Sequence, residues 1–149
     1  MVNPTSLVQR VFGFCFLAFG LNGFVHFIPQ VRMGNPALEF FLGLAATGYM
    51  LPLLYVTQAT AGALLLCGLY VPLALTLLAP IIVNIFLFHV FLAPAGLPLA
   101  MMLTAFEASL GWAYRDSFAP MLQPQAIPDQ IERYEPEDVP ADATAMHLG

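Results

Sequence analysis

The chain has 149 residues, of which 60% are hydrophobic and only 9% are charged. A soluble domain of this size has too much surface to cover with so few charges, since about a quarter of the residues in a typical globular protein are charged. The composition therefore indicates an integral membrane protein, and it excludes a nucleic-acid-binding protein because the four Lys and Arg residues form no basic cluster.

The net charge of -5 belongs to the C-terminal part of the chain. Residues 1–117 carry as many arginines as acidic residues, whereas residues 118–149 carry one arginine and six acidic residues. The second part is also rich in Pro and Gln, and it has too few apolar residues to offset the entropy of ordering. We expect a transmembrane domain over residues 1–117 and an acidic, disordered tail over residues 118–149.

The first predicted transmembrane helix covers residues 7–28, which contain a single charge. At about 1.5 Å per residue this stretch spans a hydrocarbon core of about 30 Å. A signal peptide is the alternative, but the apolar run is longer than usual for one and no small-x-small cleavage site follows it. Pro29 ends the helix, and residues 30–36 form a polar turn. Residues 37–48 are too few to span a membrane, so we expect a short interfacial helix there.

Three further spans are expected, at residues 49–70, 71–92 and 97–114. Tyrosines at both ends of the second span, and Trp112 and Tyr114 at the end of the fourth, suit the level of the lipid headgroups. Pro80 interrupts the third span, which neighbouring helices can accommodate. The expected fold is therefore an all-α membrane protein: a four-transmembrane-helix bundle with a short interfacial helix after the first span.

The arginines predict the orientation of this bundle. Four spans place both termini on one side of the membrane, together with Arg10, Arg115 and Arg133, whereas the opposite side holds only Arg32. Because cytoplasmic segments carry an excess of Lys and Arg, we expect both termini and the acidic tail to be cytoplasmic.

Six polar side chains fall within the predicted spans, where such residues are costly and usually face the protein interior. They are Asn22 and His26 on the first span, Gln58 on the second, Asn84 and His89 on the third, and Glu107 on the fourth. Counted from the non-cytoplasmic ends, the amide and carboxyl groups lie roughly 9–15 Å deep and the two histidines roughly 3–5 Å deep. Because all four spans contribute at similar depth, we expect a shared ligand-binding pocket in the outer half of the bundle.

Simpler explanations of these residues stay open. Amide groups hold transmembrane helices together by hydrogen bonds, and histidines near the interface reach water. Asn84 and His89 are five residues apart, roughly 140° around a helix, which argues against one common pocket. No Lys or Arg lies at the depth of Glu107, so we expect a neutral carboxyl group that donates a hydrogen bond to an Asn or Gln, in a proton-linked or ligand-binding role.

A metal centre is not expected. Only His26 and His89 could converge on a metal ion or haem, and no carboxylate is placed to orient them. Cys15 and Cys67 stand alone, so the sequence predicts neither thiol exchange nor a zinc site. Glycines of the first two spans are expected to allow close approach of the helices. They are Gly13, Gly20, Gly23, Gly62 and Gly68.

The order of these motifs resembles the DoxX-like family of small bacterial membrane proteins. The segment RVFGFCFLAFGLNGFVHFIP is similar to that family's first helix, in which an arginine enters the span and a glycine-flanked polar residue lies at its far end. The pattern Gln58-x-x-x-Gly62-x-Leu64-Leu65 is similar to the acid-x-x-x-Gly-x-Leu-Leu pattern of the second helix. The segment VPLALTLLAPIIVNIFLFHVFLAPAGLP resembles the Asn- and His-bearing third helix of one branch. The likeness covers about residues 7–120.

This resemblance implies a four-helix bundle in the bacterial cytoplasmic membrane, in a family linked to sulfur or quinone-linked oxidation and to redox-stress complexes. The chain has Gln58 where many relatives carry an acidic residue, so chemistry that needs a titrating carboxylate would fall to Glu107. We therefore expect an accessory or quinone-binding subunit. The alternatives are a quinone-linked oxidoreductase component and a structural protein whose acidic tail recruits a partner. The expected partners are lipid, a quinone or other small apolar ligand, and a membrane protein.

Overall fold

The computed structural model describes residues 3–28 and 34–122. The chain divides into two compact units, Met1–Phe118 and Ala119–Gly149, and of the second only the 3-10 turn η2 (Ala119–Leu122) is described. Most of the polar turn expected at residues 30–36, including Arg32, and nearly all of the acidic tail, including Arg133, lie outside the described residues.

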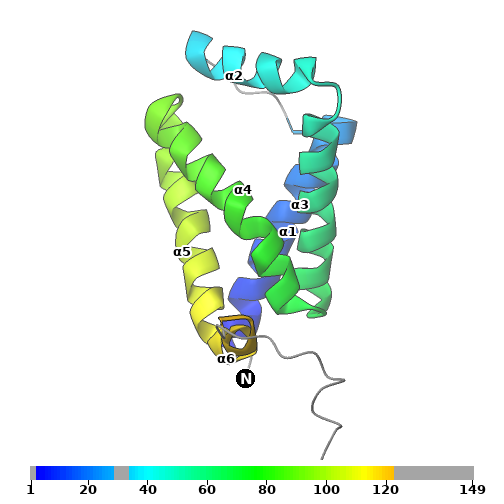
Figure 1. Cartoon of the computed structure of the whole chain (residues 1–149), viewed down its shortest axis with the longest axis vertical. Helices are drawn as coiled ribbons and strands as arrows, with labels where there is room; N and C mark the ends of the chain where they lie inside the picture. The colour runs from blue at the N-terminus through cyan, green and yellow to red at the C-terminus, as the bar shows by residue number, and fades with distance from the viewer. Residues whose placement is uncertain (1–2, 29–33, 123–149) are drawn as a thin grey trace, which may run out of the picture. The chain divides into compact units, whose positions relative to one another are not determined.

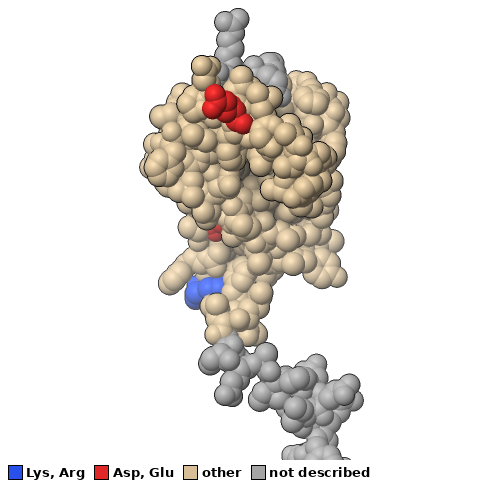
Figure 2. Space-filling model, turned by 45° about the horizontal axis from the view of Figure 1, so that its top comes forward, with Lys and Arg blue, Asp and Glu red and all other residues tan. Residues whose placement is uncertain are grey.

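All regular secondary structure in the described part of the chain is helical, as the sequence predicts. The α-helices are α1 (Pro4–Val25), α2 (Asn35–Ala46), α3 (Met50–Cys67), α4 (Val71–Phe91), α5 (Leu97–Ala113) and α6 (Arg115–Phe118), with the 3-10 turn η1 (Pro94–Gly96) before α5. Three of them, α1, α3 and α4, are long and apolar enough to cross a membrane. The described surface visible in Figure 2 is almost free of charged side chains, as expected of a surface that faces lipid.

The first helix ends three residues before the predicted boundary, and His26 lies outside it. His26 adopts the left-handed conformation, with φ of 55°, and the backbone N–H of Ile28 donates to the side-chain oxygen of Asn22 at 2.6 Å. This hydrogen bond turns the chain away from the helix axis. The prediction of a helix through residue 28 is therefore wrong at its end, because Asn22 caps the helix that apolar residues could otherwise have continued.

Four helices, α1, α3, α4 and α5, pack in a closed ring in which each contacts two neighbours: α1 contacts α3, α3 contacts α4, α4 contacts α5, and α5 contacts α1 (Figure 1). The largest fully buried side chains come from all four helices. They are Phe12, Phe16, Leu65, Leu75, Leu78, Leu103 and Leu110. The buried residues of α4 all lie between Val71 and Ile82, so the second half of this helix contributes little to the core.

Glycines bring the backbones of α1 and α3 into direct contact. A Cβ atom on Gly13 would lie 2.8 Å from the carbonyl oxygen of Gly62, and one on Gly20 would lie 2.5 Å from the amide nitrogen of Ala59. A Cβ on Gly62 would collide with the backbone of Leu17. The predicted close approach is confirmed for these glycines, and any larger residue there would force the helices apart.

Gly68 has a different role from the predicted one. Its φ of +70° is left-handed, and the nearest atom to a Cβ placed on it would be the Gln9 side-chain nitrogen, at 3.5 Å. Leu69 N–H donates to the Leu64 carbonyl at 3.0 Å, and Gly68 N–H donates to the Leu65 carbonyl at 3.2 Å. These two bonds form a Schellman motif, which ends α3 and starts the tight turn into α4.

The short helix α2 lies across the ends of α3 and α4, where these two helices diverge (Figure 1). Ala37 is completely buried, and the rings of Phe40 and Phe41 each lie 5.4 Å from the ring of Phe88 on α4. With 12 residues, α2 is too short to cross a bilayer. It closes one end of the space between α3 and α4.

Candidate functional site

A cavity of about 160 Å³ lies between α2, α3 and α4. Three of its lining residues are polar: Gln58 from α3, and Asn84 and His89 from α4. The other lining residues are apolar. They are Phe40, Phe41, Leu44, Leu54, Ile81, Ile85 and Phe88. We call this space the α2–α3–α4 cavity. It brings together three of the six polar residues predicted to form a site.

Gln58 is the buried polar group of this cavity, with only 7% of its surface exposed. Its side chain has no hydrogen-bond partner within residues 3–28 and 34–122. A primary amide offers two N–H donors and one carbonyl acceptor. Neither amide atom is among the fully buried, unpaired side-chain atoms of the described residues, so the amide reaches the cavity. Its hydrogen-bonding capacity is therefore available to a molecule that enters the cavity.

His89 is held in one orientation by the loop before α5. Its Nδ1 atom lies 2.9 Å from the carbonyl oxygen of Ala93. Because a carbonyl oxygen only accepts, Nδ1 carries the hydrogen, and in the neutral ring Nε2 is a hydrogen-bond acceptor. Gly96 packs against the imidazole so closely that a Cβ atom there would collide with the ring. His89 therefore lines the cavity in a fixed orientation, with Nε2 as the ring nitrogen that Ala93 does not use.

Asn84 is an exposed residue at the edge of the cavity. It also lines two adjoining hollows, one of about 220 Å³ with Leu87 and Phe91 and one of about 200 Å³ with Met50 and Pro80. The separation of roughly 140° between Asn84 and His89 argued against one common pocket, yet both residues line this cavity. A space wider than one side chain touches two faces of α4, so residues roughly 140° apart both line it.

Asn22 and His26 line a second cavity of about 480 Å³, together with Phe41 and Tyr55. The side-chain oxygen of Asn22 is already occupied by the backbone of Ile28, and His26 is exposed. Phe41 lines both cavities, so α2 separates them. The single shared pocket expected from the sequence is therefore divided, because α2 lies between the end of α1 and the end of α4.

Glu107 lines none of these cavities. Its neighbours one turn away on α5, Leu103 and Leu110, belong to the hydrophobic core, so Glu107 lies on the inward face of the helix. Its Oε2 atom is buried and has no hydrogen-bond partner among the described residues. The predicted bond to an Asn or Gln is therefore not formed by this atom among the described residues.

Gln9 is a buried polar residue that the sequence analysis did not single out. It is 6% exposed, its Nε2 donates to the Leu65 carbonyl at 2.7 Å, and the Tyr114 hydroxyl donates to its Oε1 at 2.6 Å. These bonds join α1, the last turn of α3 and the end of α5. The only indication of this role in the sequence was a glutamine beside Arg10 at the start of an apolar run. Its hydrogen-bond partners lie 56 and 105 residues away, so the sequence does not identify them.

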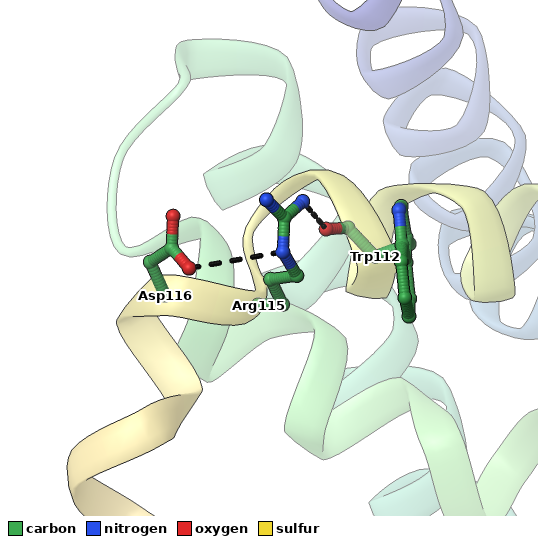
Figure 3. Close-up of polar contacts among 3 residues, drawn as sticks. All are labelled: Trp112, Arg115 and Asp116. Atoms are coloured by element: carbon green, nitrogen blue, oxygen red, sulfur yellow. Dashed lines mark hydrogen bonds and ion pairs between the residues drawn. The ribbon is translucent and has the colours of Figure 1, made fainter.

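The end of α5 carries an exposed aromatic and charged cluster (Figure 3). The guanidinium carbon of Arg115 lies 5.3 Å from the ring centre of Trp112, and Arg115 Nη1 donates to the Trp112 carbonyl at 3.2 Å. Asp116 lies 3.8 Å from Arg115 Nε, with both side chains largely in solvent. Arg115 thus caps the C-terminal end of α5 and stacks on Trp112, an arrangement typical of a helix end at the headgroup level.

Metal ligands are not gathered in the part of the chain that the structure describes: no three His, Cys, Asp or Glu residues there could hold one ion. Cys15 and Cys67 are both free thiols.

The described part of the chain is all-α, with three candidate membrane-spanning helices and a mostly apolar cavity that has three polar lining residues. No protein-family model matches the chain. No curated protein and no solved structure matches it either. The resemblance to the DoxX-like family therefore stays a prediction.

Proposed function

We propose that this chain is a multi-pass, DoxX-like protein of the bacterial cytoplasmic membrane that binds a small apolar molecule, such as a quinone head group, in the α2–α3–α4 cavity. In this proposal α1, α3, α4 and α5 all cross the bilayer, α2 lies at its outer surface, and both termini are cytoplasmic. With 17 residues α5 is about 26 Å long, close to the shortest spans, and its place in the ring between α1 and α4 supports its inclusion.

The buried amide of Gln58 carries this proposal. Small-molecule sites are mostly apolar hollows with a few well-placed polar groups, and the α2–α3–α4 cavity has this composition. A buried amide that only held helices together would be bonded to the neighbouring helix, as Gln9 is. Gln58 instead borders an open space and has no partner among the described residues, which supports a role in binding a ligand.

A flat ring suits this space for two reasons. The rings of Phe40, Phe41 and Phe88 lie 5.4–5.8 Å apart from one another at the wall of the cavity and offer faces and edges for aromatic contact. A cavity of about 150 Å³ accommodates a benzene-sized molecule, which is close to the volume found here. The oxygen of a quinone would accept hydrogen bonds from the amides of Gln58 and Asn84.

The proposal is tested by identifying what the protein retains. The parent chain, Gln58→Leu and Thr57→Val are purified in mild detergent, and their native mass spectra and organic extracts are compared. Thr57 is a matched control because it is next to Gln58 on the same helix, does not line the cavity, and its hydroxyl donates to the Leu53 carbonyl of its own helix at 2.8 Å. We expect one small molecule enriched with the parent and Thr57→Val and lost from Gln58→Leu. Identical retention by all three proteins would disprove binding at this cavity.

The number of spans is tested separately with reporter fusions. A reporter that is active only in the cytoplasm is joined after residue 93 or after residue 118. With four spans and cytoplasmic termini, the first fusion is inactive and the second is active. Equal activity of the two fusions would show that α5 does not cross the membrane.

A further inference from the structure

The α2–α3–α4 cavity continues into two neighbouring hollows. All three spaces are lined by Phe40 and Asn84. Gln58 lies at the buried end of this connected space, whereas Asn84 is exposed and stands where the three spaces meet. Next to Asn84 along α4, Val83 is 58% exposed. In a membrane this face of α4 meets the acyl chains, so the space opens sideways toward lipid at Asn84.

The volumes and walls of the three spaces indicate where the ring and the hydrocarbon chain of a bound molecule would lie. The innermost space, of about 160 Å³, holds one ring and little more. Beyond Asn84 the hollows are walled by apolar side chains, Leu87 and Phe91 on one side and Met50 and Pro80 on the other. A hydrocarbon chain joined to the ring fits these apolar walls, and it has no room beside the ring.

The hydrogen-bonding groups of Gln58 and His89, which both line the cavity, select the head. Since His89 Nδ1 is used by Ala93, Nε2 is the free ring nitrogen, and it accepts. Gln58 supplies an N–H donor. A hydroxyl group satisfies both residues, because its hydrogen is donated to Nε2 while its oxygen accepts from the amide. An ether oxygen, or the carbonyl oxygen of a quinone, still accepts from the amide but leaves Nε2 without a donor, so a hydroxyl-bearing head binds more tightly than either.

We infer that the occupant is a membrane-dissolved amphiphile: a single-ring head bearing a hydroxyl group is held at Gln58 and His89, and a hydrocarbon tail leaves past Asn84 into the lipid. This inference rests on the proposed function and adds to it the chemical class of the ligand and its direction of entry.

The test uses three probes in phosphatidylcholine nanodiscs: tritiated p-cresol, 4-dodecylphenol and 4-dodecylanisole. Bound probe is measured against its mole fraction in the bilayer, so that partition into lipid does not count as affinity. Asn84→Trp narrows the opening, and Val83→Trp is the matched control because it places the same side chain on the lipid-exposed neighbour. Gln58→Leu removes the amide at the buried end.

We expect Asn84→Trp to weaken 4-dodecylphenol binding at least about tenfold while p-cresol binding changes less than about twofold, and Val83→Trp to change neither. Gln58→Leu should weaken both phenols about tenfold, the effect of one lost hydrogen bond. The parent should bind 4-dodecylanisole about tenfold more weakly than 4-dodecylphenol, because the ether has no hydrogen to donate.

Each contrary result has its own meaning. If Asn84→Trp changes the two phenols equally or changes neither, the tail does not leave at Asn84 and the entry route is overturned. If 4-dodecylanisole binds as tightly as 4-dodecylphenol, the hydroxyl head is overturned. Either result leaves the proposed function standing as long as Gln58→Leu still weakens binding. If Gln58→Leu alters neither phenol, the cavity is not their site and both proposals fail.

Discussion

Two buried glutamines mark two regions of the same bundle with different roles. Gln9 near the start of α1 is 6% exposed, and Gln58 in the middle of α3 is 7% exposed. Gln9 donates to Leu65 and accepts from Tyr114, whereas Gln58 has no partner within residues 3–28 and 34–122. The two residues are equally buried, but their amides have different roles. The amide of Gln9 is used in hydrogen bonds that join three helices, whereas the amide of Gln58 remains available to an incoming molecule.

Packing follows the same division. The region of Gln9 adjoins the core built by Phe12 and Leu65, whereas Gln58 borders a cavity. The two regions meet on α3: Ala59 touches the backbone of α1 at Gly20, while its neighbour Gln58 lines the space toward α4. Helix α3 is thus held by α1 on one face while it presents the unpaired Gln58 on the other. The contact with α1 keeps Gln58 in position even when the cavity contains no ligand.

The largest effect is expected where α1 and α3 touch. Gly62→Leu would place a side chain into the backbone of Leu17, and because two backbones cannot yield as a side chain can, we expect a loss of about 3 kcal/mol or of the folded protein. Gly111→Leu on α5 is the control, since nothing lies near its Cβ position, and it should fold normally. SDS-induced unfolding in micelles measures both. Similar stability of the two variants would refute the rigid α1–α3 contact.

A smaller loss is expected at Gln9. Gln9→Leu leaves the Leu65 carbonyl and the Tyr114 hydroxyl without their partner, which should lower the free energy of unfolding by about 1–2 kcal/mol. Tyr114→Phe removes one of the two bonds and should cost about half as much. The same SDS titration compares them, and a neutral Gln9→Leu would remove the structural role of this residue.

Gln58→Leu tests the comparison of the two glutamines most directly, because it should not lower the free energy of unfolding as Gln9→Leu does. Replacing an unpaired buried amide by an apolar side chain of similar size should leave the ligand-free protein as stable as the parent or up to about 1 kcal/mol more stable. The measurement is made on delipidated protein so that no ligand contributes. A loss as large as that of Gln9→Leu would mean that Gln58 also holds the bundle together.

The smallest effect is expected at the exposed end of α5. Arg115→Ala removes an ion pair and a cation–π contact that lie largely in solvent, so the free energy of unfolding should change by less than about 0.5 kcal/mol. Thermal unfolding of the two proteins in the same detergent measures this. A loss above about 1 kcal/mol would place this cluster among the contacts that stabilise the fold.

Part of the fold was predictable from local signals. Long apolar runs, prolines and glycines located the helices within a few residues, because helix length and chain breakers depend on neighbours in sequence. The end of α1 was mispredicted since a single side chain, Asn22, decides it. The candidate site was predictable only as a set of polar residues, and its division between two cavities depends on where α2 packs.

The sequence by itself determined that this is a helical protein with apolar, membrane-length segments and polar groups within them, since composition and periodicity are properties of the chain alone. Only the tertiary structure decided which polar groups are already satisfied. Gln9 and Gln58 look alike in the sequence, yet the partners of Gln9 lie 56 and 105 residues away, and Gln58 finds none among the described residues. Hydrogen-bond partners and cavities arise from the packing of distant segments, which no local pattern specifies.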